Sequence, residues 1–466
     1  MISPTACSIR PGLVWVLAAA ALLLAPSPAA AVGLADSVAR ALAFNPDLRV
    51  VASDRRAVEQ ELAQARALLW PSLEVRLAAG PEWSRNDATR RPGGNDSKLL
   101  LRSEARLVLR QRLFDGYATR SEIARQQARL TSAARRVREA AEFVALDAVR
   151  AHLEVLRLSA IVELNRDNLE THERWLAKVR RLEQAGRVSI ADLRQAEARV
   201  AQARENLAVA EGQLRDAEAA YRRVVGEPPG ALELDFEPAG GLPAGADEAA
   251  ALAAAASPTV QIRAADVRVA EAELRAARAG FYPRLDLELA AAANNGVLGD
   301  TDENASASAL LLFRYDLYRG GADLAREREA FHRLNQARAE LARARLEAER
   351  TARQAFNALQ TARTRLEALA ERAEAQRRTR DAYAQQFDLG QRGLLDLLDA
   401  ENELFLARAD LISARFIERF AAFRLLAVTG QLLEQLGLEP PQAARSATPP
   451  TPAAELEAKA EPLKEP

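Results

Sequence analysis

Two aspartates near the end of the chain, Asp396 and Asp399, have a spacing that brings side chains together on a helix. Residues three positions apart share a helix face, so both carboxylates can point in one direction. Such a pair has three possible uses: a carboxylate dyad in catalysis, an acidic constriction in a pore, or favourable charges in the first turn of a helix. The two residues alone favour the last of these.

Residues that could complete a catalytic or metal site are scarce. The sequence has one cysteine, Cys7, and three scattered histidines that we expect on the surfaces of long helices: His152, His172 and His332. No nucleophile, group of metal ligands or phosphate-binding loop stands near the two aspartates. We therefore predict that the protein is not an enzyme and that it uses no cofactor and no metal.

The composition points to long helices rather than to a basic binding surface. In 466 residues, 64 lysines and arginines balance 65 aspartates and glutamates, which gives a formal net charge of −1. A general nucleic-acid binder needs a surplus of positive charge, so we expect no nucleic-acid partner. Aromatic residues make up 5% of the chain, and alanine, leucine, arginine and glutamate dominate it, as they do in coiled helices.

The first 31 residues have the features of a secretory signal peptide. Arg10 precedes an apolar run over residues 13–25, and small residues follow that run up to Ala31. The run is short for a helix that spans a bilayer. We therefore predict a signal peptide over residues 1–31, whose removal would leave a chain without cysteine, as suits an oxidising compartment.

The remaining chain is a duplication. Prolines and glycines that mark helix ends recur at constant distances, the prolines 212 positions apart and the glycines 204. The pairs are Pro46 with Pro258, Pro71 with Pro283, Gly186 with Gly390, and Gly226 with Gly430. Repeats of equal length indicate that both halves build the same shape.

Each repeat is expected to contain a helix, two strands and two long helices. The first repeat covers residues 32–226, with long helices over 118–185 and 190–225. A proline-rich connector over 227–246 follows. The second repeat covers 247–437, with long helices over 322–389 and 394–429. Residues 438–466 are rich in proline, alanine and glutamate, and we expect a disordered tail there.

The long helices carry an apolar seam. Leucine or a similar residue recurs every seven positions from Leu193 to Tyr221, and alanine recurs three residues later from Ala196 onward; the second repeat has the same pattern from Leu397 and Ala400. Two apolar positions in seven are typical of coiled coils. The seam fits side-by-side packing into a tube of helices and fits a closed antiparallel hairpin equally well.

Four segments alternate between apolar and polar residues, over about 72–80, 98–113, 284–294 and 305–317. Alternation of this kind fits a half-buried soluble sheet or the wall of a membrane barrel. Each segment has about the ~9–11 residues that a tilted strand needs to cross a bilayer. Four strands cannot close a barrel and open edges cannot lie in lipid, so membrane strands would have to be shared among several chains. Trp70 and Tyr282, which precede strands, suit either a membrane-interface aromatic belt or a helix cap.

These features together resemble the TolC-like outer-membrane efflux family. The resemblance covers residues 34–437 and is most specific in YAQQFDLGQRGLLDLLDAENEL, residues 383–404. The segment RLFDGYATRSEIARQ, residues 112–126, and the segment GQRGLLDLLDAENELF look most like the subgroup that serves type I secretion.

The resemblance implies a mainly α fold with a β-barrel portion. Three copies would form a twelve-strand outer-membrane barrel in contact with lipid and a twelve-helix periplasmic tunnel. Such a protein is a passive exit duct that binds a periplasmic adaptor (membrane fusion) protein and, through it, an inner-membrane ABC transporter or a proton-driven pump. Alternatives are an outer-membrane channel for multidrug or metal efflux and, from another class, a soluble periplasmic coiled-coil scaffold.

The resemblance also assigns site residues. Asp396 and Asp399 match the family's aspartate rings that narrow the tunnel. Arg392 matches an arginine of the closed gate, and Phe387 stands where its tyrosine partner is common, so the usual hydroxyl is missing. The turns that would contact the adaptor are Gly186, Arg187, Val188 and Ser189 in the first repeat, with Gly390, Gln391 and Gly393 in the second.

Overall fold

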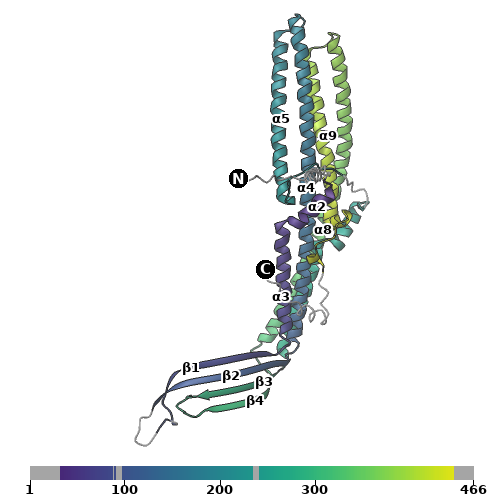
Figure 1. The fold of residues 1–466 in the computed structure, drawn as a ribbon. Coiled ribbons are helices and arrows are strands. Elements are labelled where there is room, and N and C mark those ends of the chain that lie inside the picture. The colour runs from purple at the N-terminus through teal and green to yellow at the C-terminus, as the bar shows by residue number, and fades with distance from the viewer. Residues whose placement is uncertain (1–31, 88, 91–96, 235–240, 446–466) are drawn as a thin grey trace, which may run out of the picture. The chain divides into compact units, whose positions relative to one another are not determined.

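The computed structural model describes residues 32–87, 89–90, 97–234 and 241–445 (Figure 1). The predicted signal peptide at residues 1–31 lies outside the described residues, as does the part of the expected tail after residue 445.

The chain divides into two compact units, and each takes segments from both sequence repeats. Of the described residues, the first unit contains 32–44, 145–234 and 361–420, and the second contains 45–87, 89–90, 97–144, 241–360 and 421–445. Three long helices contribute residues to both units. These are α4 (Ala118–Gln184), α8 (Ala322–Asp388) and α9 (Leu394–Thr429).

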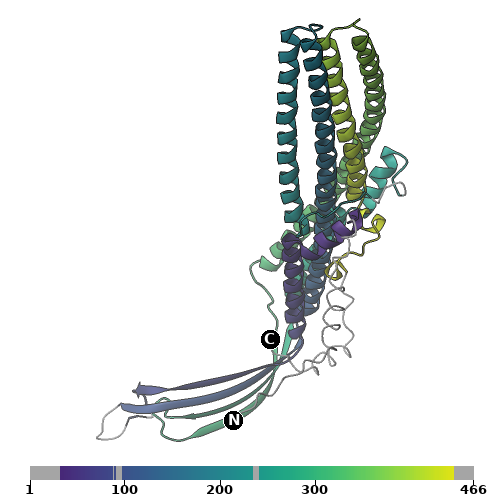
Figure 2. The ribbon, with the colours of Figure 1, turned by 45° about the horizontal axis from the view of Figure 1, so that its top comes forward.

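The first unit is a set of long helices arranged as two hairpins. The distal part of α4 runs antiparallel to α5 (Ile190–Val225), and the distal part of α8 runs antiparallel to α9, as Figures 1 and 2 show. The predicted seam is buried: Ala196, Val200, Leu397 and Ala400 are each at most 4% exposed. α4 and α8 each end one residue earlier than expected. The short helix α2 (Leu34–Phe44) packs against α5.

Two histidines that we expected on helix surfaces are buried, and that expectation was wrong. His152 is fully buried, and its Nδ1 lies 2.9 Å from Ser37 Oγ, which also lies 2.8 Å from the hydroxyl of Tyr221. This chain of hydrogen bonds ties α2 and α5 to α4. His172 is also buried, whereas His332 is exposed as expected.

The helical part of the second unit combines α3 (Pro46–Ala67) and α7 (Pro258–Arg278) with the proximal parts of α4 and α8. Val58 and Leu62 of α3 pack against Leu130 and Ala133 of α4. The helix α6 (Ala246–Ala256) packs through its alanines against α8 and α9. None of the described helices is both long enough and apolar enough to cross a membrane.

The start that we predicted for the disordered tail, residue 438, is too early. After α9 the chain forms α10 (Leu432–Gln435) and the 3-10 helix η3 (Gln442–Ala444). η3 packs against α3, and Ala444 is only 5% exposed. Residues 438–445 therefore belong to the second unit, because Ala444 is buried where η3 packs against α3.

The second unit also contains a four-stranded antiparallel sheet in the order β1-β2-β3-β4. The strands are β1 (Ser72–Ser84), β2 (Lys98–Phe114), β3 (Arg284–Asn295) and β4 (Asn304–Arg314). β1 continues four residues beyond the expected end, and β4 stops three residues before it. No described strand pairs with the outer edge of β1 or of β4.

The register of the sheet places apolar rows from all four strands on one face. Leu73 pairs with Leu109, Leu109 with Leu289, and Leu289 with Ala309, which makes one continuous apolar row. The opposite face carries charges, with Arg76 opposite Arg106. Many of the apolar side chains are exposed, Leu77 at 74% and Leu311 at 63% among them. An exposed apolar face of this extent marks a surface that contacts lipid or protein.

Candidate functional site: the tip of the helical hairpins

Two equivalent turns form the tip of the first unit. Gly186 (φ +70°) and Gly390 (φ +71°) adopt left-handed backbone conformations that favour glycine. The N–H of Arg187 donates to the carbonyl of Leu182 at 2.8 Å, and the N–H of Gln391 donates to that of Gln386 at 2.9 Å. The duplicated glycines thus close both long helices in the same way.

Most residues predicted to contact an adaptor are exposed at these turns. The exposed ones are Gly186, Arg187, Ser189, Gly390, Gln391 and Gly393. Ser189 also forms a capping box with Asp192 that starts α5, whereas Gly393 stands at the matching position before α9. Val188 differs from the others, because it is half-buried and packs against the apolar residues beneath the turns.

An apolar cluster beneath the turns joins the four long helices α4, α5, α8 and α9. We call it the tip cluster; its buried members are Val179, Leu193, Ala196, Phe387, Leu394, Leu397 and Leu398. Phe387, predicted at a gate contact, is 9% exposed, and its ring meets that of Trp175 edge-on at 6.0 Å. In this structure Phe387 is a packing residue between α8 and α4.

Two ion pairs link the first hairpin to the second around the tip cluster. Lys178 of α4 pairs with Asp388 of α8, and its ammonium lies 5.1 Å from the ring centre of Trp175. Arg199 of α5 pairs with Asp399 of α9 at 2.8 Å. Asp399 therefore has a cationic partner from its own chain.

Asp396 also has an arginine beside it. Arg392 Nη1 lies 3.4 Å from the Asp396 carboxylate, and Arg392 Nε donates to Gln386 Oε1 at 2.8 Å. The guanidinium stacks on the ring of Tyr383 at 3.8 Å, which is a cation–π contact. Both predicted aspartates are about half exposed, and each carries a partly compensated charge.

A buried polar group that we did not predict lies beside these pairs. Glu401 is 5% exposed and accepts hydrogen bonds from Trp175 Nε1 and from Arg380, both at 3.1 Å. His172 is buried nearby, and burial lowers its pKa, an effect that the charge of Glu401 partly opposes. Glu401 belongs to the motif over residues 383–404, and that motif is the sequence signal that could have identified it. Nothing in the sequence indicated that Lys178 pairs with Asp388 or that Arg199 pairs with Asp399.

The predicted interface aromatics lie in the second unit, where helices meet strands. Trp70 is 75% exposed and Tyr282 is 48% exposed. The Tyr282 ring meets that of Tyr117 edge-on at 6.1 Å, and Tyr117 contacts Phe114 in the same way at 5.6 Å. Exposed aromatic rings at strand ends are compatible with a membrane interface. The assignment of Trp70 and Tyr282 to that interface stays a prediction.

Comparison with known proteins gives the family. The family described as "Outer membrane efflux protein" matches residues 38–227 and 249–431. The outer membrane efflux protein BepC of Brucella suis is 28% identical over 335 residues, which are 72% of this chain and 73% of BepC. The proteases secretion protein PrtF of Dickeya chrysanthemi is 28% identical over 436 residues, 90% and 93% of the two chains. The alkaline protease secretion protein AprF of Pseudomonas aeruginosa is 28% identical over 452 residues, 93% and 91%.

Solved structures give the same fold. CusC has a TM-score of 0.74 at 17% identity, over 87% of this chain and 92% of CusC. The outer-membrane channel OprN has a TM-score of 0.71 at 20% identity, over 86% and 90%. The open MtrE outer-membrane channel of Neisseria gonorrhoeae also scores 0.71 at 20% identity, over 86% and 89%. The predicted mainly α fold with a β-barrel portion is confirmed, and because the family match covers both repeats, this chain belongs to the outer membrane efflux protein family and resides in the outer membrane.

Proposed function

We propose that three copies of this chain form the passive exit duct of a tripartite system for type I protein secretion, with no catalytic activity of its own. The observation that carries the proposal is the sheet: one face is apolar, and both outer edges lack a described partner. Each unpaired backbone group would cost several kcal/mol in hydrocarbon. β4 of one copy and β1 of the next satisfy each other, and closure after three copies removes every edge.

Protein secretion is favoured over small-molecule efflux because the relatives named for secretion align with a larger share of this chain. PrtF and AprF, which are named for protease secretion, align with at least 90% of this chain. BepC, named for efflux, aligns with 72% of it at the same identity. Efflux of drugs or metals is therefore the second candidate.

The exposed tip supports contact with a periplasmic adaptor. At Gly186 and Gly390 the turns expose main chain without a side chain, and a Cβ placed on either glycine would have no atom within 4 Å. Such a surface admits close approach by helices of a partner. The inner-membrane component behind that adaptor is an ABC transporter in the secretion case and a proton-driven pump in the second candidate.

We also propose that Asp396 and Asp399 line the narrowest part of the duct. Threefold symmetry would bring six carboxylates together, which favours cations. The ion pairs with Arg392 and Arg199 lower this charge within each copy, so the strength of the ring depends on whether those pairs are intact.

The first test is whether the protein assembles and conducts. Protein extracted from outer membranes is expected to migrate as a heat-modifiable trimer and to form ion-conducting pores in planar bilayers. A folded protein that stays monomeric in buffer without detergent would contradict the duct.

A second test separates secretion from efflux. Deletion of the gene is expected to abolish release of a protein substrate and to leave resistance to small toxic compounds unchanged. The reverse result would establish the second candidate.

A further inference from the structure

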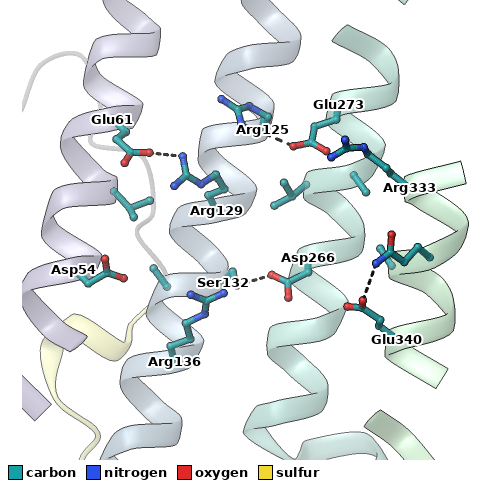
Figure 3. A pocket seen from close by; sticks show the side chains of 16 residues that line it. Asp54, Glu61, Arg125, Arg129, Ser132, Arg136, Asp266, Glu273, Arg333 and Glu340 are labelled. Atoms are coloured by element: carbon teal, nitrogen blue, oxygen red, sulfur yellow. Dashed lines mark hydrogen bonds and ion pairs between the residues drawn. The ribbon is translucent and has the colours of Figure 1, made fainter. Parts of the chain in front are cut away.

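A charged groove crosses the helical part of the second unit. It has a volume of about 510 Å³ and is lined by α3, α4, α7 and α8, whose charged side chains gather on one face (Figure 3). Four arginines and five carboxylates line it. The near balance of charge distinguishes this groove from the acidic pair at the tip.

Seven of these nine charged side chains already have a hydrogen-bond or ion-pair partner. Arg129 of α4 pairs with Glu61 of α3, and Ser132 of α4 donates to Asp266 of α7 at 2.8 Å (Figure 3). These contacts fix neighbouring helices and leave little charge for a ligand. They form the frame of the groove.

Two opposite charges in the groove remain available. Arg136 of α4 and Asp54 of α3 are exposed, and neither has a hydrogen bond or an ion pair with any residue that the structure describes. Figure 3 places both on the face of the groove, on adjacent helices. An unpaired arginine and an unpaired carboxylate on adjacent helices of one groove can contact both signs of charge on a passing chain.

The groove lies on the same side as the charged face of the sheet. Asp54 and Glu61 of α3 and Leu68, which caps the C-terminal end of α3, follow one another at intervals of seven residues, so they lie along one side of the helix. Asp54 and Glu61 line the groove, and Leu68 lines a second hollow together with Arg110 and Glu288 of the sheet's charged face. If the apolar face of the sheet contacts lipid, its charged face and the groove both face the interior of the duct.

We propose that this groove is part of the inner wall of the duct, and that Arg136 and Asp54 contact charged side chains of the exported polypeptide. The inference rests on the proposed function, because only a closed trimer gives the two faces of the sheet different surroundings. A wall of balanced charge offers weak contacts to acidic and basic segments alike, which suits transit better than retention.

Thiol labelling in intact cells tests which way the groove faces. Cys7 is the only cysteine in the sequence, so with Cys7→Ser a variant at one further position carries a single thiol. We compare Arg136→Cys with Gln127→Cys, which is also exposed and lies nine residues away, on the opposite face of α4. A bulky maleimide that cannot cross the outer membrane can still enter the barrel from outside.

The expected result is labelling of Arg136→Cys in intact cells and labelling of Gln127→Cys only after the outer membrane is permeabilised. Labelling of Arg136→Cys only after permeabilisation, or labelling of Gln127→Cys in intact cells, would overturn the assignment. The conductance of the wild-type trimer is measured separately, so failure of the duct itself is distinguished from a groove that faces outward.

The ion selectivity of the pore gives a second readout. Arg136→Gln and Gln127→Glu each lower the net charge by one unit per copy, and they do so on opposite faces of α4. In a salt gradient across a planar bilayer, Arg136→Gln is expected to raise the cation-to-anion permeability ratio roughly twofold, whereas Gln127→Glu leaves it unchanged. Equal behaviour of the two variants would overturn the role of Arg136.

Discussion

Glu142 is a buried acid whose pKa is raised by its surroundings. It lies on α4, is 4% exposed, and accepts hydrogen bonds from the backbone N–H groups of Leu432 and Leu433. Burial raises its pKa from 4.5 to about 7, although the charge of Arg138 and the two N–H groups oppose this rise. One oxygen of the carboxyl group, Oε2, has no hydrogen-bond partner. The residue thus anchors α10 while carrying a desolvated charge.

The pKa of Glu142 predicts how stability depends on pH. The folded state holds the proton more tightly than the unfolded state, so the free energy of unfolding falls as pH rises from about 4.5 to about 7. Glu142→Gln should remove this decline and stabilise the protein at pH 8 by up to about 3 kcal/mol. Thermal unfolding of the detergent-solubilised protein between pH 5 and pH 8 measures this decline, because the carboxyl group titrates within that range. The matched change Glu139→Gln should keep the decline; an unchanged decline in Glu142→Gln would refute the assignment.

The aspartates at the tip yield a second prediction at the residue scale. Asp396→Ala combined with Asp399→Ala should lower the cation preference of the pore and weaken its block by divalent cations, because the acidic ring is lost. Arg199→Gln should act in the opposite direction, since it frees Asp399 from its ion pair. Asp388→Asn, which removes the partner of Lys178, is the control at the same tip. Selectivity that is unchanged in the double variant would show that these residues do not line the constriction.

The sequence predicted the burial and the partners of single side chains less well than it predicted the helix ends that paired glycines mark. Asp396 and Asp399 could be singled out because they lie close together in the chain. The partner of Asp399, Arg199, lies 200 positions earlier in the chain, and only the packing of α5 against α9 brings the two together. His152 was misjudged for a similar reason, since Ser37 of α2 and Tyr221 of α5 cover it from distant segments.

At the scale of elements, the apolar seam explains why such long helices are stable. Leu397 is fully buried in the tip cluster, whereas Leu395, two residues earlier on α9, is 49% exposed. Leu397→Ala should cost about 2–5 kcal/mol, because it leaves a cavity between helices. Leu395→Ala should change stability by less than about 0.5 kcal/mol. Thermal unfolding of both variants in detergent measures the difference, and equal losses would mean that the seam is not buried in the assembled protein.

The elements were predicted from the sequence more reliably than their ends. The duplicated glycines and the seven-residue repeat placed all four long helices within one residue of their bounds. The end of β1 was predicted too early, because the alternation of apolar and polar residues stops before Gly80 and Pro81. The strand continues to Ser84 since β1 lies at the edge of the sheet, where proline is tolerated because its missing N–H is not needed by a neighbour.

At the scale of the whole molecule, the duplicated unit carries surfaces that one copy cannot satisfy. The sheet exposes an apolar face and two edges without a described partner, and the tip exposes Asp396 and Asp399, whose carboxylates would come together in the proposed trimer. The period-two pattern predicted the apolar face of each strand, but not that the four faces would join into one. Their register, which depends on pairing between segments from both repeats, became visible only in the structure.

Two adjacent leucines on β4 test whether that face contacts lipid. Leu311 lies on the apolar face and Leu310 on the charged one, and they are 63% and 47% exposed in the single chain. In a closed barrel an arginine on the lipid side costs up to about 2–4 kcal/mol per copy near the bilayer centre, whereas one on the inner side remains in water. Leu311→Arg should therefore reduce the heat-stable trimer in outer-membrane extracts, and Leu310→Arg should leave it near the wild-type amount. If both variants assemble equally well, the apolar face does not contact lipid, and the barrel shared among three copies would have to be abandoned.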